Sequence, residues 1–239
     1  MNKIFFIFRV FIVVFSLLVF FGSSQAATIQ GLVKYEGEAP KFKEIKMDAD
    51  PICLTHHSQA VFPQTLVLGP NNEVANIFVH ITKGVPKGDY PVPPEEVVID
   101  QKGCMYEPHI LGVYVGQTVK ILNPDGTLHN VHGIPKINPE FNIAMPKFRT
   151  EITKVFDKEE FMFPMKCDVH PWMSAWVSVV SHPFFAVTKA DGAYTLNNLP
   201  AGEYEISAWH EKLGTQTINV TVGEGETKDI NFTFSKPSQ

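Results

Sequence analysis

Short runs of alternating apolar and polar residues, separated by Gly, Pro, Asn and Asp, recur along most of this chain and constrain its fold more than any other feature. Residues 28–35, 118–122 and 203–209 are examples. A two-residue alternation is typical of strands with one buried face, whereas helices need a repeat near 3.6 residues. Since strong helical periodicity is hard to find anywhere, the sequence predicts a nearly all-β protein.

One loop carries most of the chemistry. Cys167, His170 and Met173 follow one another at three-residue steps, and Pro171 between them argues against a helix. A thiol, an imidazole and a thioether are soft or borderline ligands, and a His₂Cys set with a weak axial Met stabilises copper that cycles between Cu(I) and Cu(II). The loop therefore predicts a mononuclear copper site that lacks one imidazole.

The segment around residue 129 supplies that imidazole. The sequence Leu128-His129-Asn130-Val131-His132-Gly133 follows the alternating run 118–122 and the turn residues 123–126. Structural zinc is an alternative, but a Met ligand would be unusual for zinc. A binuclear copper centre needs a second cysteine on the loop, and c-type haem attachment needs C-x-x-C-H; the sequence contains neither.

Together, LHNVHG at 128–133 and CDVHPWM at 167–173 resemble the cupredoxins, the blue copper proteins, and most closely their amicyanin and plastocyanin-like branch. The resemblance covers about 85 residues and implies a Greek-key β-sandwich. It implies His129, Cys167 and His170 as strong ligands and Met173 as the weak axial ligand of one copper ion. Met165 and Lys166 depart from the family, in which aromatic residues are frequent before the Cys.

The same resemblance assigns roles around the ligands. Asn130 matches a position whose side chain ties the two ligand loops together by hydrogen bonds. His132 corresponds to an imidazole that is not a ligand. Apart from the resemblance, the position of Pro171 and Trp172 beside His170 in the loop predicts that they lie near the surface, as an apolar patch for docking a redox partner. For Trp172, ordinary packing is an equally good interpretation.

A third segment resembles a second family. DGAYTLNNLPAGEYEISAWHEKLG at 191–214 is similar to the carboxypeptidase regulatory-like domains, which are small transthyretin-like antiparallel β-sandwiches. Their usual early strands correspond here to residues 31–33 and 75–81, far upstream. We therefore expect the cupredoxin unit to be inserted into a split sandwich.

The expected boundaries follow from these segments and from composition. Residues 1–26 read as an export signal, residues 27–95 as a β segment that completes the C-terminal sandwich, and residues 96–181 as the cupredoxin domain. Residues 182–234 read as the carboxypeptidase regulatory-like sandwich and residues 235–239 as a tail. The signal has two basic residues, an apolar run and small residues before a cleavage position. Retention as an uncleaved anchor is the alternative.

Net charge and cysteine content indicate which partners and which cellular compartment to expect. The formal net charge is −5, and removal of the signal takes two basic residues and no acidic ones, which disfavours nucleic acid as a partner. Export predicts a periplasmic or secreted protein with no membrane association after cleavage. Three cysteines in an oxidising compartment predict a disulfide between Cys53 and Cys104 that leaves Cys167 free as a thiolate ligand. Two buried, unpaired cysteines are the alternative.

Further histidines near these two cysteines make a second metal site an alternative interpretation. His56 and His57 follow Cys53, and His109 follows Cys104. A disulfide with nearby surface histidines explains the same residues more simply.

The predicted function is that of an exported electron carrier, and not that of an enzyme. Four protein ligands leave no open coordination position for a substrate. The expected partner is a redox protein such as a c-type cytochrome or a dehydrogenase. The alternative is a protein that stores or delivers copper, or one that binds carbohydrate through its sandwich.

Overall fold

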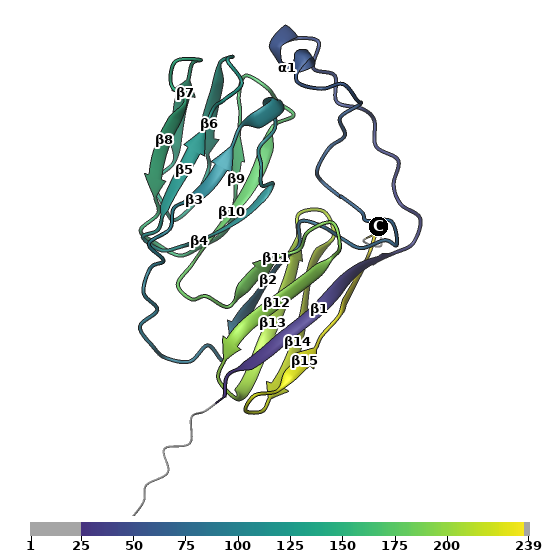
Figure 1. The fold of residues 1–239 in the computed structure, drawn as a ribbon, viewed down its shortest axis with the longest axis vertical. Coiled ribbons are helices and arrows are strands. Elements are labelled where there is room, and N and C mark those ends of the chain that lie inside the picture. Colours follow the sequence, from purple (N-terminus) through teal and green to yellow (C-terminus); the bar gives the residue numbers. More distant parts are fainter. Residues whose placement is uncertain (1–24, 237–239) are drawn as a thin grey trace, which may run out of the picture.

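The computed structural model describes residues 25–236, and two stacked β units make up this part of the chain (Figure 1). The predicted export signal lies outside the described residues, except for its last two positions. The only regular helices within residues 25–236 are α1 (Pro51–Thr55) and a 3₁₀ turn (Lys102–Cys104). None of the described helices is long and apolar enough to cross a bilayer. The nearly all-β prediction is confirmed.

The central unit, residues 97–180, holds eight strands in two sheets. One sheet has the order β4-β10-β9-β6-β7 and the other β3-β5-β8. The bounds are β3 (Val97–Asp100), β4 (Ile110–Tyr114), β5 (Thr118–Leu122), β6 (His129–Gly133), β7 (Phe141–Met145), β8 (Glu151–Val155), β9 (Glu160–Lys166) and β10 (Ser174–Val180). Alternate side chains of both sheets meet in one apolar core, which includes Cys167 and Met173.

The flanking unit takes strands from both ends of the chain. β1 (Ala27–Glu36) pairs with three C-terminal strands, and β2 (Phe78–Lys83) lies between two others in the order β11-β2-β13-β14. The C-terminal strands are β11 (Phe185–Val187), β12 (Ala193–Leu199), β13 (Gly202–His210), β14 (Gly214–Val222), β15 (Thr227–Asp229) and β16 (Phe232–Ser235). This unit has its own core, in which residues 27–35 and 74–81 pack against residues 194–234.

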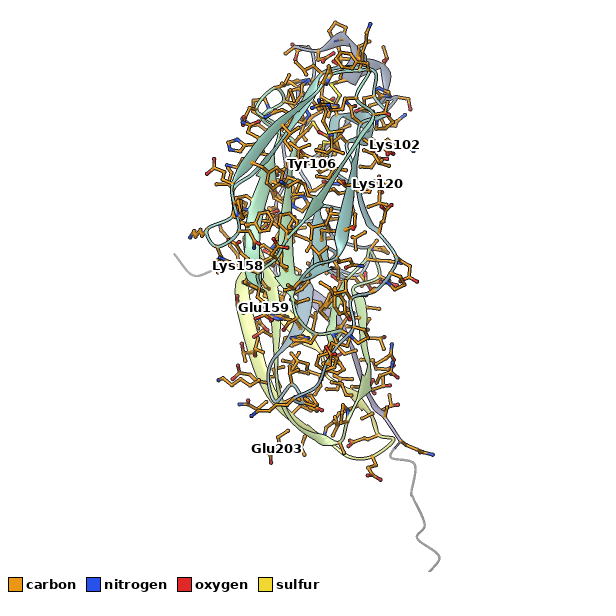
Figure 2. All side chains as sticks on the ribbon, turned by 90° about the vertical axis from the view of Figure 1, so that its left-hand side faces the viewer. Lys102, Tyr106, Lys120, Lys158, Glu159 and Glu203 are labelled. Carbon is orange, nitrogen blue, oxygen red and sulfur yellow. A yellow bond between two sulfur atoms is a disulfide. The ribbon has the colours of Figure 1, made fainter. Side chains whose placement is uncertain are left out.

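The two units share a small apolar junction. Phe78, Ile110, Met162 and Val180 are buried there, and the ring of Phe78 stacks on Phe185 with centroids 5.5 Å apart. Gly112 on β4 allows this approach, because a Cβ at that position would lie 2.3 Å from the Phe185 ring. Figure 2 shows Glu159 at the level where the two units meet, Tyr106 above it in the central unit, and Glu203 near the lower end, in the flanking unit.

Residues 37–64 leave the flanking unit and reach the far end of the central unit. Figure 1 shows this long connection running from β1 to α1, which stands beside the end of the central sheets that lies away from the flanking unit. Asp50 begins α1 as its N-cap residue, and Pro51 occupies the first turn, where a missing amide costs no hydrogen bond. The helix is joined to the central unit by a disulfide between Cys53 and Cys104.

Candidate metal centre

The candidate ligands converge from a strand and a loop at one end of the central unit. His129 begins β6, and Cys167 and His170 lie in the loop between β9 and β10. The Sγ atom of Cys167 lies 4.0 Å from Nδ1 of His129 and 3.8 Å from Nδ1 of His170. The two Nδ1 atoms are 2.9 Å apart. Three potential ligand atoms thus surround one small space.

This geometry suits a single ion. Metal–nitrogen bonds of about 2.0 Å and metal–sulfur bonds of about 2.3 Å bring ligands of a shared ion to within about 3–4 Å of each other. The three side chains are almost inaccessible to solvent, with exposed fractions of 0% for His129 and 2% for both Cys167 and His170. The donor set, two imidazoles and one free thiol, matches the softer ligands that select copper.

Met173 ends the ligand loop, and its backbone bonds back to the start of the loop. Its side chain is fully buried in the same core cluster as Cys167. Its amide donates to the carbonyl of His170 at 2.9 Å, and its carbonyl accepts from the amide of Cys167 at 3.3 Å. These bonds fold the seven-residue loop back on itself, so that three of the four side chains predicted to be ligands belong to one compact turn.

Asn130 joins the two ligand segments. Its Oδ1 atom accepts hydrogen bonds from the amides of Asp168 at 2.6 Å and Val169 at 3.3 Å, and its own amide points at the Cys167 sulfur at 3.5 Å. Tyr106 adds a second tie, since its hydroxyl lies 3.1 Å from the carbonyl oxygens of both Asn130 and Lys166. The ligand positions are therefore fixed by hydrogen bonds that do not depend on an ion.

The thiol and the imidazole of His129 are electrostatically coupled. Burial raises the pKa of the Cys167 thiol, but hydrogen bonds from His129 and from the amide of Asn130 outweigh burial and lower it. Burial lowers the pKa of His129, but hydrogen bonds to Asp125 and Cys167 outweigh burial and raise it to about 9. The lowered thiol pKa favours the thiolate, which is the form that binds metal.

His170 behaves differently. Burial lowers its pKa and outweighs the opposing hydrogen bond to Asp50. His170 is therefore neutral at pH 7, as a metal-binding imidazole must be.

Two acidic residues near the site were not predicted from the sequence. Asp125 lies four residues before His129 in a segment that reads as a turn, and Asp50 is 120 residues away from His170. The only signal for Asp50 was its place before Pro51, which is typical of a helix N-cap. That signal predicts a helix start and says nothing of a metal site.

The other predicted residues have definite places. Pro171 is exposed, whereas Trp172 is half-buried, with its ring 5.1 Å from that of His170 and its Nε1 donating to the carbonyl of Cys104 at 3.0 Å. His132, excluded as a ligand, lies at 3.1 Å from both Asp168 and Glu140 at the surface.

Within residues 25–236, His56, His57 and His109, the histidines of the second possible metal site, do not meet in a group of potential ligand atoms. His109 hydrogen-bonds to Glu211 of the flanking unit and to the carbonyl of Ser174. His57 donates to the carbonyl of Gly103, and His56 approaches Asp125. The disulfide predicted between Cys53 and Cys104 is present, and Cys167 is the free cysteine of the described chain.

Comparisons with known proteins give matches to both parts of the chain. The family model of the carboxypeptidase regulatory-like domain matches residues 170–235. Among solved structures, an oxidized amicyanin variant is 26% identical, covers 43% of this chain and 98% of its own, and has a TM-score of 0.33. A reduced amicyanin variant is 27% identical with the same coverage and a TM-score of 0.32.

A third similar structure is a copper-containing nitrite reductase from Thermus scotoductus SA-01. It is 22% identical, covers 41% of this chain and 25% of its own, and has a TM-score of 0.31. A comparison with curated proteins gave no match. The two resemblances stated from the sequence, to amicyanin-like cupredoxins and to the carboxypeptidase regulatory-like domain, both recur among these findings.

Proposed function

We propose that this protein binds one copper ion through His129, Cys167, His170 and Met173 and carries single electrons between redox partners. The observation that carries the proposal is the inward orientation of the two imidazoles. Each ring directs its Nε2 atom at a carboxylate, which favours a proton on that nitrogen, and turns its Nδ1 atom toward the other ring, so that the two Nδ1 atoms lie 2.9 Å apart beside the thiol. Two Nδ1 atoms and a thiolate this close need a shared cation: a proton on His129, whose pKa is raised, in the ion-free chain, or a metal ion that replaces it.

The surrounding residues favour electron transfer over catalysis. A bound copper ion would supply one-electron chemistry between its two oxidation states. The hydrogen bonds of Asn130 and Tyr106 hold the ligand segments in place. Fixed ligands minimise the rearrangement that accompanies a change of charge. With four protein ligands and almost no solvent access, a substrate has no open coordination position to occupy. The same closure disfavours a role in copper delivery, which requires a second protein to reach the ion.

A docking face follows from the same loop. Pro171 is exposed, and the neighbouring Val169 is 44% exposed, although both flank a buried ligand. The half-buried ring of Trp172 links the His170 ring to this surface. We place the contact with a redox protein here, with a c-type cytochrome or a dehydrogenase as the class of partner. The predicted export signal and the disulfide support a periplasmic or secreted location.

The test is spectroscopic and kinetic. The full chain, loaded with Cu(II), should show an intense visible thiolate-to-copper band and the matching paramagnetic resonance spectrum, and a reduced c-type cytochrome should bleach that band reversibly. Cys167→Ser is the matched control, because it removes the thiolate and leaves the disulfide intact. A colourless Cu(II)-loaded protein would contradict the copper site, and a coloured protein that no redox protein reduces would contradict the carrier role.

A further inference from the structure

The outer nitrogen of His170 is covered by a separate part of the chain. We call residues 47–57 the covering segment; it contains α1, and Met47 and Cys53 within it are buried in the core of the central unit. Nε2 of His170 lies 3.1 Å from Oδ2 of Asp50 and 3.6 Å from Sγ of Cys53. As a result His170 is only 2% exposed, although its loop is at the end of the molecule.

Asp50 is held in place by more than its contact with His170. Its Oδ1 atom accepts from the amide of Ile52 at 2.9 Å, the bond that caps α1, and its Oδ2 atom accepts from the hydroxyl of Thr127 at 2.8 Å. Thr127 is two residues before His129. The carboxylate therefore connects the covering segment with both ligand segments, and it cannot turn away from His170 without breaking these bonds.

His129 has a matching partner. Oδ2 of Asp125 lies 3.0 Å from its Nε2 atom, and the same carboxylate accepts from the amides of Gly103 at 2.8 Å and Cys104 at 2.6 Å. Cys104 forms the disulfide with Cys53 of the covering segment. Both imidazoles thus face acids whose supporting segments are joined by one covalent bond.

We propose that Asp50 is a positioning residue of the copper site, supplied by the covering segment. Its carboxylate accepts the Nε2 proton of His170, which fixes the ring with the Nδ1 lone pair toward Cys167. A carboxylate on the outer nitrogen also makes the imidazole a stronger donor to a metal. Its negative charge, on the other side of the His170 ring from the ion position and only 18% exposed, would favour Cu(II) over Cu(I). This inference rests on the proposed function, since it concerns the same ion.

The consequence concerns which partners the site can serve. With acids on both outer nitrogens, the bound ion gives up its electron more readily than it would with neutral partners. The partner that reduces it must therefore be a strong donor.

The experiment compares Asp50→Asn with wild type in the copper-loaded full chain. Asn keeps the shape and can still cap α1 through its amide oxygen, while the NH2 group in place of Oδ2 removes both the negative charge and the acceptor that faces His170 and Thr127. The measured quantity is the ratio of Cu(II) to Cu(I) affinity, from the midpoint potential and from competition with chelators for each ion. We expect the ratio to fall by about tenfold or more, because changes of such outer partners cost about 10–100-fold in metal affinity. Asp48→Asn, at an exposed position of the same segment, is the control and should change the ratio less than twofold.

The outcomes separate this inference from the proposed function. If wild type shows the thiolate-to-copper band and Asp50→Asn leaves the ratio within twofold of wild type, Asp50 has no such role. If wild type itself shows no band, the proposed copper site is contradicted, whatever the result for Asp50→Asn. Should Asp50→Asn not fold, Asp50→Ser provides the second variant, because Ser also caps a helix but cannot place a carboxylate at His170. An unchanged ratio in that variant would overturn the inference equally.

Discussion

The Nδ1 atoms of His129 and His170 point at each other across 2.9 Å, although 41 positions separate the two residues. Neither ring could be placed this way by its own segment alone. β6 directs His129 inward, and the closed turn between Cys167 and Met173 directs His170 toward it. The space between the rings and the Cys167 sulfur is where copper chemistry can be tested most directly.

Cys167→Ser should abolish the intense visible band and weaken copper binding strongly, because the hydroxyl of Ser is not ionised at pH 7 and is a poor ligand for a soft ion. Absorption and chelator competition on the copper-loaded protein measure both effects. His132→Gln is the control, since His132 is at the surface and contacts Asp168 and Glu140. Its band should match that of wild type, and a loss of colour there would assign the wrong imidazole to the site.

Asn130→Ala should loosen the ligand loops without removing a ligand. The substitution leaves the amides of Asp168 and Val169 without their acceptor, and such losses at buried positions cost about 1–3 kcal/mol. Chemical denaturation of the copper-free protein measures the free energy of unfolding. Asn142→Ala is the matched control, because Asn142 contacts Asn130 and the Asp168 carboxylate but no backbone amide of the loop. If both variants lost the same free energy of unfolding, the hydrogen bonds of Asn130 to the loop amides would contribute no more than those of Asn142.

The residues that meet at the candidate site could be predicted because most of their information is local. Cys167, His170 and Met173 lie within one seven-residue loop, and His129 follows an alternating run that reads as a strand. The carboxylates could not be predicted in the same way. Asp50 reaches His170 across 120 residues of sequence, through an irregular segment whose path depends on tertiary contacts.

For the fold too, features set by neighbouring residues could be predicted, and features set by contacts between distant residues could not. The alternating runs are local, and they predicted the β class correctly. The junction between the units was not predicted, because it combines residues of β2, β4, β9 and β10 whose apolar character is equally consistent with either core. Gly112 illustrates the difficulty: a glycine in a strand signals a close approach, but not that the neighbour is the Phe185 ring.

Removing the disulfide should uncover the metal site. In the Cys53→Ser, Cys104→Ser double variant, we expect the free energy of unfolding to fall by about 2–5 kcal/mol. The covering segment should also open more often, because non-covalent contacts alone then hold it: the burial of Met47 and the hydrogen bonds of Asp50 and His57. Hydrogen exchange of the amides in residues 47–57 measures the opening. Protection equal to that of wild type would show that the segment is held independently of Cys53.

Substitution of Phe78 should weaken the junction more than the metal site. Phe78 is fully buried between Phe185 and Phe161, and truncation of such a ring costs about 3–5 kcal/mol. We expect Phe78→Ala to lower the free energy of unfolding by this amount while the visible band of the copper-loaded protein stays unchanged. Phe148→Ala, at a position that is 82% exposed, is the control and should be near neutral. A bleached band in Phe78→Ala would mean that the junction supports the ligands directly.

Acid should destabilise the protein through two histidines far from the ligand loop in sequence. Burial lowers the pKa of His80 and of His210 to about 4. Both residues take up protons more readily in the unfolded chain, so the free energy of unfolding should fall as the pH drops from 6.5 to 4, by about 3 kcal/mol for each. Denaturation at several pH values should show a shallower decline over this window in His80→Leu and in His210→Gln, whatever their stability at pH 7. Parallel curves for wild type and both variants would mean that other groups cause the acid sensitivity.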